Sequence, residues 1–102
     1  MDDLGERISY LAVKRGVAVF ASDGARLGRV VRVLREAKAD IFDGIIFDTT
    51  AGPGGHKFVD APEVGEIYER GVMLKIDAAE AAELPKPTAN QSGGLWRRLS
   101  GR

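Results

Sequence analysis

The sequence contains no cysteine, and its longest run of apolar residues, from Val17 to Ala21, is only five residues long. The absence of cysteine excludes disulfides, thiolate metal ligands and cysteine nucleophiles. The absence of a long apolar run excludes a transmembrane helix, which needs about twenty such residues. The opening MDDLGER is acidic where a signal peptide is basic. We therefore expect a cytoplasmic protein with no membrane-spanning segment.

The chain as a whole also lacks a net charge, because 15 Lys and Arg balance 15 Asp and Glu among its 102 residues. This balance hides a division between two parts of the chain. Residues 1–84 hold 11 basic and 15 acidic residues, whereas residues 85–102 hold four basic residues and no acidic one. Phosphate contacts require clustered Lys and Arg, so the acidic body makes nucleic acid an unfavoured partner. We expect one domain over 1–84 and a flexible basic tail over 85–102.

Thirteen glycines punctuate short apolar runs, which is typical of a small β domain. Asp23-Gly24 follows the run at 17–21 and is a strong hairpin signal, because both central turn positions tolerate a positive φ. The next segment, 27–34, has apolar residues at helical spacing. Gly28 and three valines disfavour a helix there, and the preceding turn favours a returning strand.

Further strands are expected at 41–48, 57–60 and 72–76, with a short strand or a turn at 66–69. Residues 41–48 are apolar at both parities, so both faces of that strand should be covered. Asp77 and Glu80 have the spacing of a capping box and predict a short helix over 77–84. The expected core residues are Val19, Val30, Ile45, Phe47, Leu74 and Ile76. Phe42 and Ile46 have the opposite parity to Ile45 and Phe47, so we expect one pair to face outward and to favour a homodimer.

Few residues suggest chemistry. The loop at 49–57 lacks the spacing of a phosphate-binding loop, and His56 is the only histidine. Asp48 and Asp60 flank His56, but one loop histidine is more often solvated than a metal ligand or a general base. We expect no catalytic, cofactor-binding or metal-binding residue. The arginines at 26, 29, 32 and 35 are three residues apart, so in a regular strand they alternate between faces and form no single stripe.

The segment 94–100 places the only Trp outside the expected core. Leu95, Trp96 and Leu99 would share one helical face, with Arg97 and Arg98 beside them. One interpretation is a Trp packed on the domain or an unstructured end. The other is a recognition peptide, made of these five residues, for a protein partner or, weakly, for an anionic membrane surface.

The residues from Gly16-Val17 to Asp23-Gly24, followed by Leu27-Gly28-Arg29-Val30, resemble the opening of a PRC-barrel domain. The resemblance continues through 40–46 and to Val72 and Leu74, and covers residues 8–84. It implies an all-β fold, a small closed antiparallel barrel of about six strands. Members of this family are similar to docking modules and offer no catalytic residues to carry over. They include the cytoplasmic domain of the reaction-centre H subunit and the C-terminal domain of the ribosome maturation factor.

These observations favour a non-catalytic protein-interaction module of the free-standing PRC-barrel type. The alternative is an RNA- or ribosome-associated assembly factor, which rests on the family analogy alone. A small-ligand carrier or an enzyme is the most remote alternative. The sequence identifies neither the partner nor the cellular process.

Overall fold

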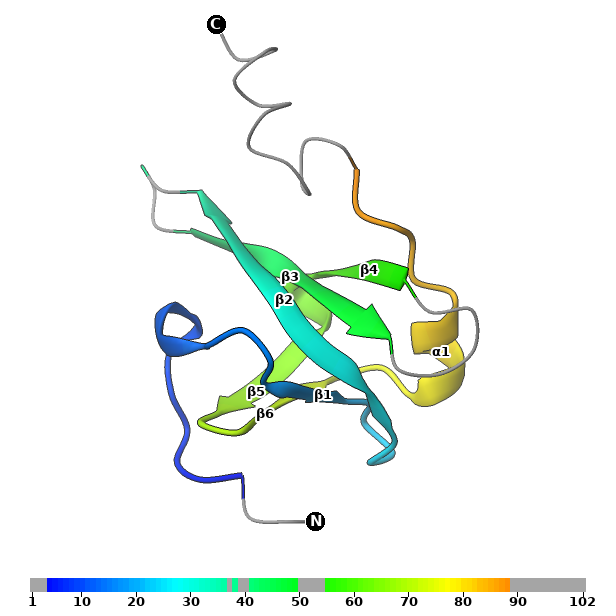
Figure 1. Ribbon diagram of the computed structural model, residues 1–102, viewed down its shortest axis with the longest axis horizontal. Coiled ribbons are helices and arrows are strands. Elements are labelled where there is room, and N and C mark those ends of the chain that lie inside the picture. The colour runs from blue at the N-terminus through cyan, green and yellow to red at the C-terminus, as the bar shows by residue number, and fades with distance from the viewer. Residues whose placement is uncertain (1–3, 37, 39–40, 50–54, 89–102) are drawn as a thin grey trace, which may run out of the picture.

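The computed structural model of the chain describes residues 4–36, 38, 41–49 and 55–88. The described residues form a single six-stranded sheet in the order β4-β3-β2-β1-β6-β5 (Figure 1). Its strands are β1 (Ala18–Phe20), β2 (Arg26–Glu36), β3 (Ile41–Thr49), β4 (Gly55–Asp60), β5 (Val64–Tyr68) and β6 (Gly71–Leu74). One α-helix, α1 (Ala78–Ala82), and two 3-10 helices, η1 (Tyr10–Ala12) and η2 (Ala61–Glu63), complete the described elements.

The β-rich fold class is confirmed, but the closed antiparallel barrel is not shown. The sheet ends at β4 and at β5, and within the described ranges no strand pair joins these two ends. Four of the five neighbouring pairs are antiparallel, whereas β1 and β6 run parallel. A hairpin can join only antiparallel strands, and β1 and β6 instead meet after a long excursion of the chain through β2–β5.

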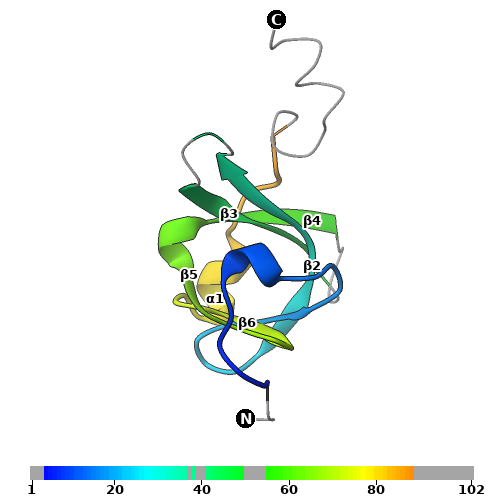
Figure 2. The same cartoon turned by 90° about the vertical axis from the view of Figure 1, so that its left-hand side faces the viewer.

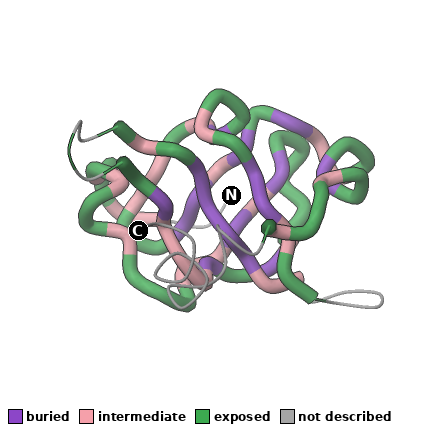
Figure 3. The backbone as a smooth tube through the Cα atoms, turned by 90° about the horizontal axis from the view of Figure 1, so that it is seen from above, coloured by how far each residue is buried: buried purple, intermediate pink, exposed green. Residues whose placement is uncertain are grey.

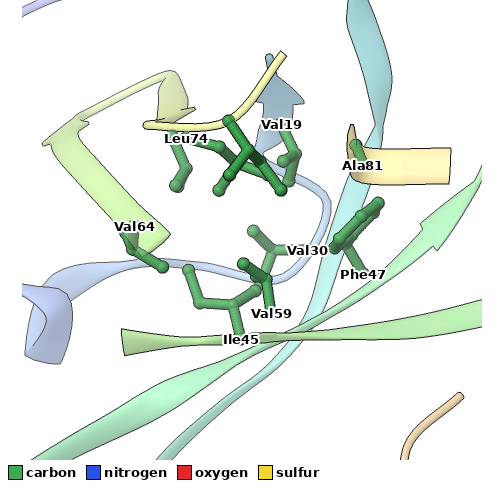
Figure 4. Close-up of a cluster of buried hydrophobic side chains, with 10 residues drawn as sticks. Val19, Val30, Ile45, Phe47, Val59, Val64, Leu74 and Ala81 are labelled. Carbon is green, nitrogen blue, oxygen red and sulfur yellow. The ribbon is translucent and has the colours of Figure 1, made fainter. Parts of the chain in front are cut away.

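All six strands nevertheless turn one face toward the same core. Ten buried residues pack together there, including Ala81 from α1 (Figure 4). The six residues expected in the core all belong to this cluster, with exposed fractions between 0% and 9%. In Figure 3 the buried positions lie along the crossing strands, and the connections around them are exposed. The sheet is therefore curled around its inner face.

Segments outside the strands cover part of both sheet edges. On β5, the amide of Ile8 donates to the Ile67 carbonyl at 2.9 Å. On β4, the amide of Phe58 donates to the Pro85 carbonyl, also at 2.9 Å. Beyond residue 8 the chain forms η1, not a strand, and Figure 2 looks onto this helix at one end of the sheet. Such coverage hides backbone groups that would otherwise pair with another chain.

The turn and helix signals of the sequence are confirmed. The chain reverses at Asp23-Gly24, where Gly24 has φ 91° and its amide donates to the Ala21 carbonyl at 2.9 Å. In α1, Asp77 accepts from the Glu80 amide at 2.8 Å, and Glu80 accepts from the Asp77 amide at 3.0 Å. Segment 27–34 lies in β2 and is a strand, as expected. Segment 66–69 lies largely in β5.

The expected pairing of Phe42 with Ile46 on one face is wrong. Ile46 lies on the outer face in a small cluster with Leu34 and Phe58 and is only 1% exposed. Phe42 packs against the core cluster instead, and its ring stacks on Tyr10 with centroids 4.8 Å apart. The reason is an irregularity at Gly44, where two steps along β3 match one step along β2 and invert the alternation. The apolar patch that favoured a homodimer is therefore absent at these two residues.

Candidate functional site

One row of paired residues crosses four strands on the outer face. Ala18 on β1 pairs with Arg29 on β2, Arg29 pairs with Asp48 on β3, and Asp48 pairs with His56 on β4. Side chains of directly paired residues lie about 5 Å apart at Cβ and point to the same side of the sheet. The small side chain of Ala18 leaves room on this face, and longer charged side chains flank it. The row therefore forms a shallow depression at Ala18 that is bordered by charged side chains.

Three arginines of β2 share this face, which corrects the expectation that their spacing of three residues separates them. Arg26 pairs with Phe20, Arg29 with Ala18 and Asp48, and Arg32 with Ile46. In each interval the partner strand advances two residues while β2 advances three. Each extra residue of β2 forms a β-bulge. In a regular strand an arginine three residues further on would point to the inner face, and the bulge returns it to the outer face. We call Arg26, Arg29 and Arg32 the arginine stripe.

Two adjoining hollows lie beside Arg26 and Arg29 of the arginine stripe, and together we call them the basic groove. One, of about 430 Å³, is lined by Arg15, Gly16, Arg29, Val30, Val31, Asp48 and His56. The other, of about 460 Å³, is lined by Lys14, Arg15, Gly16, Val17, Ala18, Arg26, Glu69 and Arg70. Both are open to solvent, and they meet at Arg15 and Gly16. The loop before β1 thus forms a wall common to both hollows.

The charges of the groove oppose those of the surrounding body. Five basic and two acidic residues line it, whereas residues 1–84 carry four more acidic than basic residues. Arg70 pairs with Glu69 at 3.9 Å, and both side chains are about half exposed or more. The side chains of the other four lining cations, Lys14, Arg15, Arg26 and Arg29, make no hydrogen bond or ion pair with a described residue. Arg29 thus makes no ion pair with Asp48 although the two are register partners. An anion in the groove would relieve the repulsion among these cations.

His56 lies on β4 and not on a loop as expected, because that strand begins at Gly55. Asp48 is its direct neighbour across the β3–β4 pair. Asp60 is four residues further along β4, which places it about 13 Å away along the strand. No group of three potential metal ligands converges among the described residues. The trio considered from the sequence is therefore not brought together.

Tyr68 on β5 forms a hydrogen-bonded pair with Glu66 outside the basic groove, and this pair changes the pKa of Tyr68. Its hydroxyl donates to Glu66 Oε1 at 2.7 Å. This hydrogen bond, assisted by the negative charge of Glu66, raises the pKa of Tyr68 above its ordinary value. The pair is exposed on the sheet edge, where Arg7 also approaches Glu66 at 3.8 Å.

The predicted recognition peptide, residues 95–99, lies outside the described residues. The structure does show how the segment leading to it is attached. Lys57 Nζ donates to the carbonyls of Ala82 at 3.1 Å and Leu84 at 2.9 Å, next to the bond from Phe58 to Pro85. The chain therefore passes the edge of β4 before it continues toward its C-terminus (Figure 1).

Neither the protein-family models nor the curated proteins include a match to this sequence. Among the described residues, no helix has the length and apolar character that crossing a bilayer demands. The basic groove was missed at the sequence level because regular alternation was assumed for β2. The signal available was the repeated Arg-x-x-Arg spacing itself, which becomes a stripe only if each interval contains a bulge.

Proposed function

We propose that this chain is a non-catalytic docking module of the PRC-barrel type that binds an acidic segment of a protein partner. The basic groove is the observation that carries the proposal. Two of its unpaired cations, Arg26 and Arg29, stand on β2 of the sheet, whose inner face is well packed, and the other two, Lys14 and Arg15, stand on the loop before β1. Arginine is well suited to this role because its planar donors match carboxylate geometry.

A protein partner is favoured over nucleic acid for two reasons. Asp48 and Glu69 line the groove together with the cations and would repel a continuous row of phosphates. Apart from His56, the described lining contains no aromatic ring on which a base could stack. A protein segment of mixed composition can place its acidic side chains near the cations and leave the two acidic positions uncovered.

The proposal extends to the features that the described residues leave open. It includes the closed barrel that the family resemblance implies and a cytoplasmic location. It also includes Leu95, Trp96, Arg97, Arg98 and Leu99 as a second contact with the partner. Self-association stays a prediction, although Phe42 and Ile46, the apolar pair on which it was based, do not share a face. Sedimentation of the pure protein tests it.

The test compares binding of a fluorescent poly-glutamate peptide by the full chain and by the double variant Arg15→Ala/Arg29→Ala. We expect about a tenfold loss of affinity in the variant, since each exposed charge contributes up to about 1 kcal/mol. The matched control removes two exposed positive charges elsewhere, in Lys38→Ala/Lys75→Ala. Equal affinities of the two double variants, or no binding by the unaltered chain, would contradict the proposal. Stronger binding of single-stranded RNA than of the peptide would favour the alternative assembly-factor role.

The tail has its own measurement, because Trp96 is the only tryptophan. If residues 95–99 contact the partner, the emission of Trp96 should shift to the blue when the acidic peptide binds. A shift that occurs with anionic vesicles and not with the peptide would instead assign the tail to membrane surfaces. An emission already blue in the pure protein and lost only on unfolding would place Trp96 against the domain.

A further inference from the structure

The three residues of the arginine stripe are evenly spaced along the sheet, at a distance that their spacing in the sequence does not show. The residues that pair with Arg26 and Arg29 on β1 are Phe20 and Ala18, two residues apart. The residues that pair with Arg29 and Arg32 on β3 are Asp48 and Ile46, again two residues apart. Two residues of strand span about 7 Å. The three arginines therefore stand at two consecutive intervals of about 7 Å on one face of the sheet.

None of the three side chains of the arginine stripe makes a hydrogen bond or ion pair with a described residue. Arg26 and Arg29 are exposed, and Arg32 is half-buried beside the outer cluster of Leu34, Ile46 and Phe58. The aliphatic stem of an arginine can cover apolar surface while its guanidinium stays in water. The stripe thus presents three cationic groups to solvent over a strand that pairs with β1 at Arg26, with both neighbours at Arg29 and with β3 at Arg32.

We infer that the stripe binds an extended acidic segment whose carboxylates occur at every second residue. In an extended chain alternate side chains point to the same side and repeat at about 7 Å, the same interval as the stripe. Consecutive carboxylates would point alternately toward and away from the sheet, and a helix would offer a different interval. This inference rests on the proposed function and adds the conformation and sequence pattern of the partner segment.

The experiment compares two labelled peptides of identical composition with the full chain. One alternates three Glu with Ser, and the other places its three Glu consecutively before its Ser, so that only two of its carboxylates can face the stripe in an extended chain; fluorescence anisotropy gives the affinities. We expect the alternating peptide to bind about fivefold more tightly, because all three charge pairs form at once. The preference should disappear in Arg29→Ala, which removes the central group. Arg35→Ala is the matched control, since it alters the same strand three residues further on, past the irregularity at Gly44, and should keep the preference.

The outcomes separate the inference from the proposed function. If both peptides bind equally and Arg29→Ala weakens both, the groove binds acidic segments without reading their pattern, and the inference is overturned. If neither peptide binds the unaltered chain, the proposed function fails as well. If Arg35→Ala abolishes the preference as fully as Arg29→Ala, the stripe is wrongly assigned. Thermal unfolding of each variant shows that any loss of binding occurs in a folded protein.

Discussion

The inner and outer faces of the sheet are formed by different features of the sequence. The inner face gathers ten buried residues from all six strands, from α1 and from the segment between β6 and α1, whereas the outer face buries three residues and presents charged groups. The inner residues follow the plain alternation of a strand. The outer arginines share a face only because β2 has two extra residues. The packing of the expected core residues can thus be deduced from periodicity, whereas the pattern of the binding surface, like the position of Phe42, depends on the register between strands.

The sharpest difference between buried and exposed positions is expected within β3. Ile45→Ala removes a side chain that is 0% exposed and should lower the free energy of unfolding by about 2–5 kcal/mol. Ile41→Ala is the matched control, because the same residue type is 56% exposed there and its loss should cost less than about 0.5 kcal/mol. Denaturant unfolding measures both. Similar losses would mean that β3 does not insert Ile45 into the core.

A substitution at Gly44 directly tests the irregularity in β3 that turns Phe42 toward the core. Gly44 has φ 151°, and a Cβ there would collide with the Val59 carbonyl and the ring of Phe58. We expect Gly44→Ala to lower the free energy of unfolding by about 2–4 kcal/mol. Gly24→Ala, at φ 91° with no heavy atom within 4 Å of the added carbon, should cost only about 1 kcal/mol. An equal cost at both positions would show that the outer face leaves room at Gly44.

The helix that supplies Ala81 to the inner face depends on its cap. Asp77→Ala removes the acceptor for the Glu80 amide and should lower the free energy of unfolding by about 1 kcal/mol. Asp60 occupies the equivalent position before η2 but makes no capping hydrogen bond, so Asp60→Ala should have almost no effect. Thermal unfolding compares the two variants. A larger effect at Asp60 would contradict the capping geometry.

The smallest effect is expected on the sheet edge, in the titration of Tyr68. Its raised pKa in the folded state means that the stabilising hydrogen bond to Glu66 is fully present below the ordinary tyrosine pKa. That contribution is lost as the pH rises through the folded-state pKa. Glu66→Gln should move the tyrosinate absorbance transition to lower pH. Measurement in a Tyr10→Phe background assigns the signal to Tyr68, and an unmoved transition would show that Glu66 is not what raises the pKa of Tyr68.

Much of the fold could be predicted because its signals are local. The Asp23-Gly24 turn, the Asp77–Glu80 capping box and the alternation of Val72 and Leu74 each depend on residues within a few positions of one another. The six predicted core residues followed from the same periodicity. The parallel contact between β1 and β6 had no local signal, because it joins segments from opposite ends of the domain.

The candidate site could not be predicted for a related reason. Whether Arg26, Arg29 and Arg32 share a face depends on where β2 carries an extra residue relative to β1 and β3. That choice is set by packing, since the extra residues Leu27 and Val31 both contact buried clusters. His56 was misplaced because a glycine-rich segment was taken to continue past Gly55, where pairing with Thr49 already begins.

The parallel pair of β1 and β6 has a consequence for the order of folding. The hairpins from β1 to β4 connect neighbouring segments and can form while the chain is being synthesised, but β1 lacks its second neighbour until residues 71–73 emerge. Closing so large a loop has an entropic cost that must be met before the contact contributes any stability. We therefore expect docking of β6 to limit the folding rate. Until it occurs, Val19 remains exposed at the margin of an unfinished sheet, which makes this stage the most vulnerable to intermolecular association.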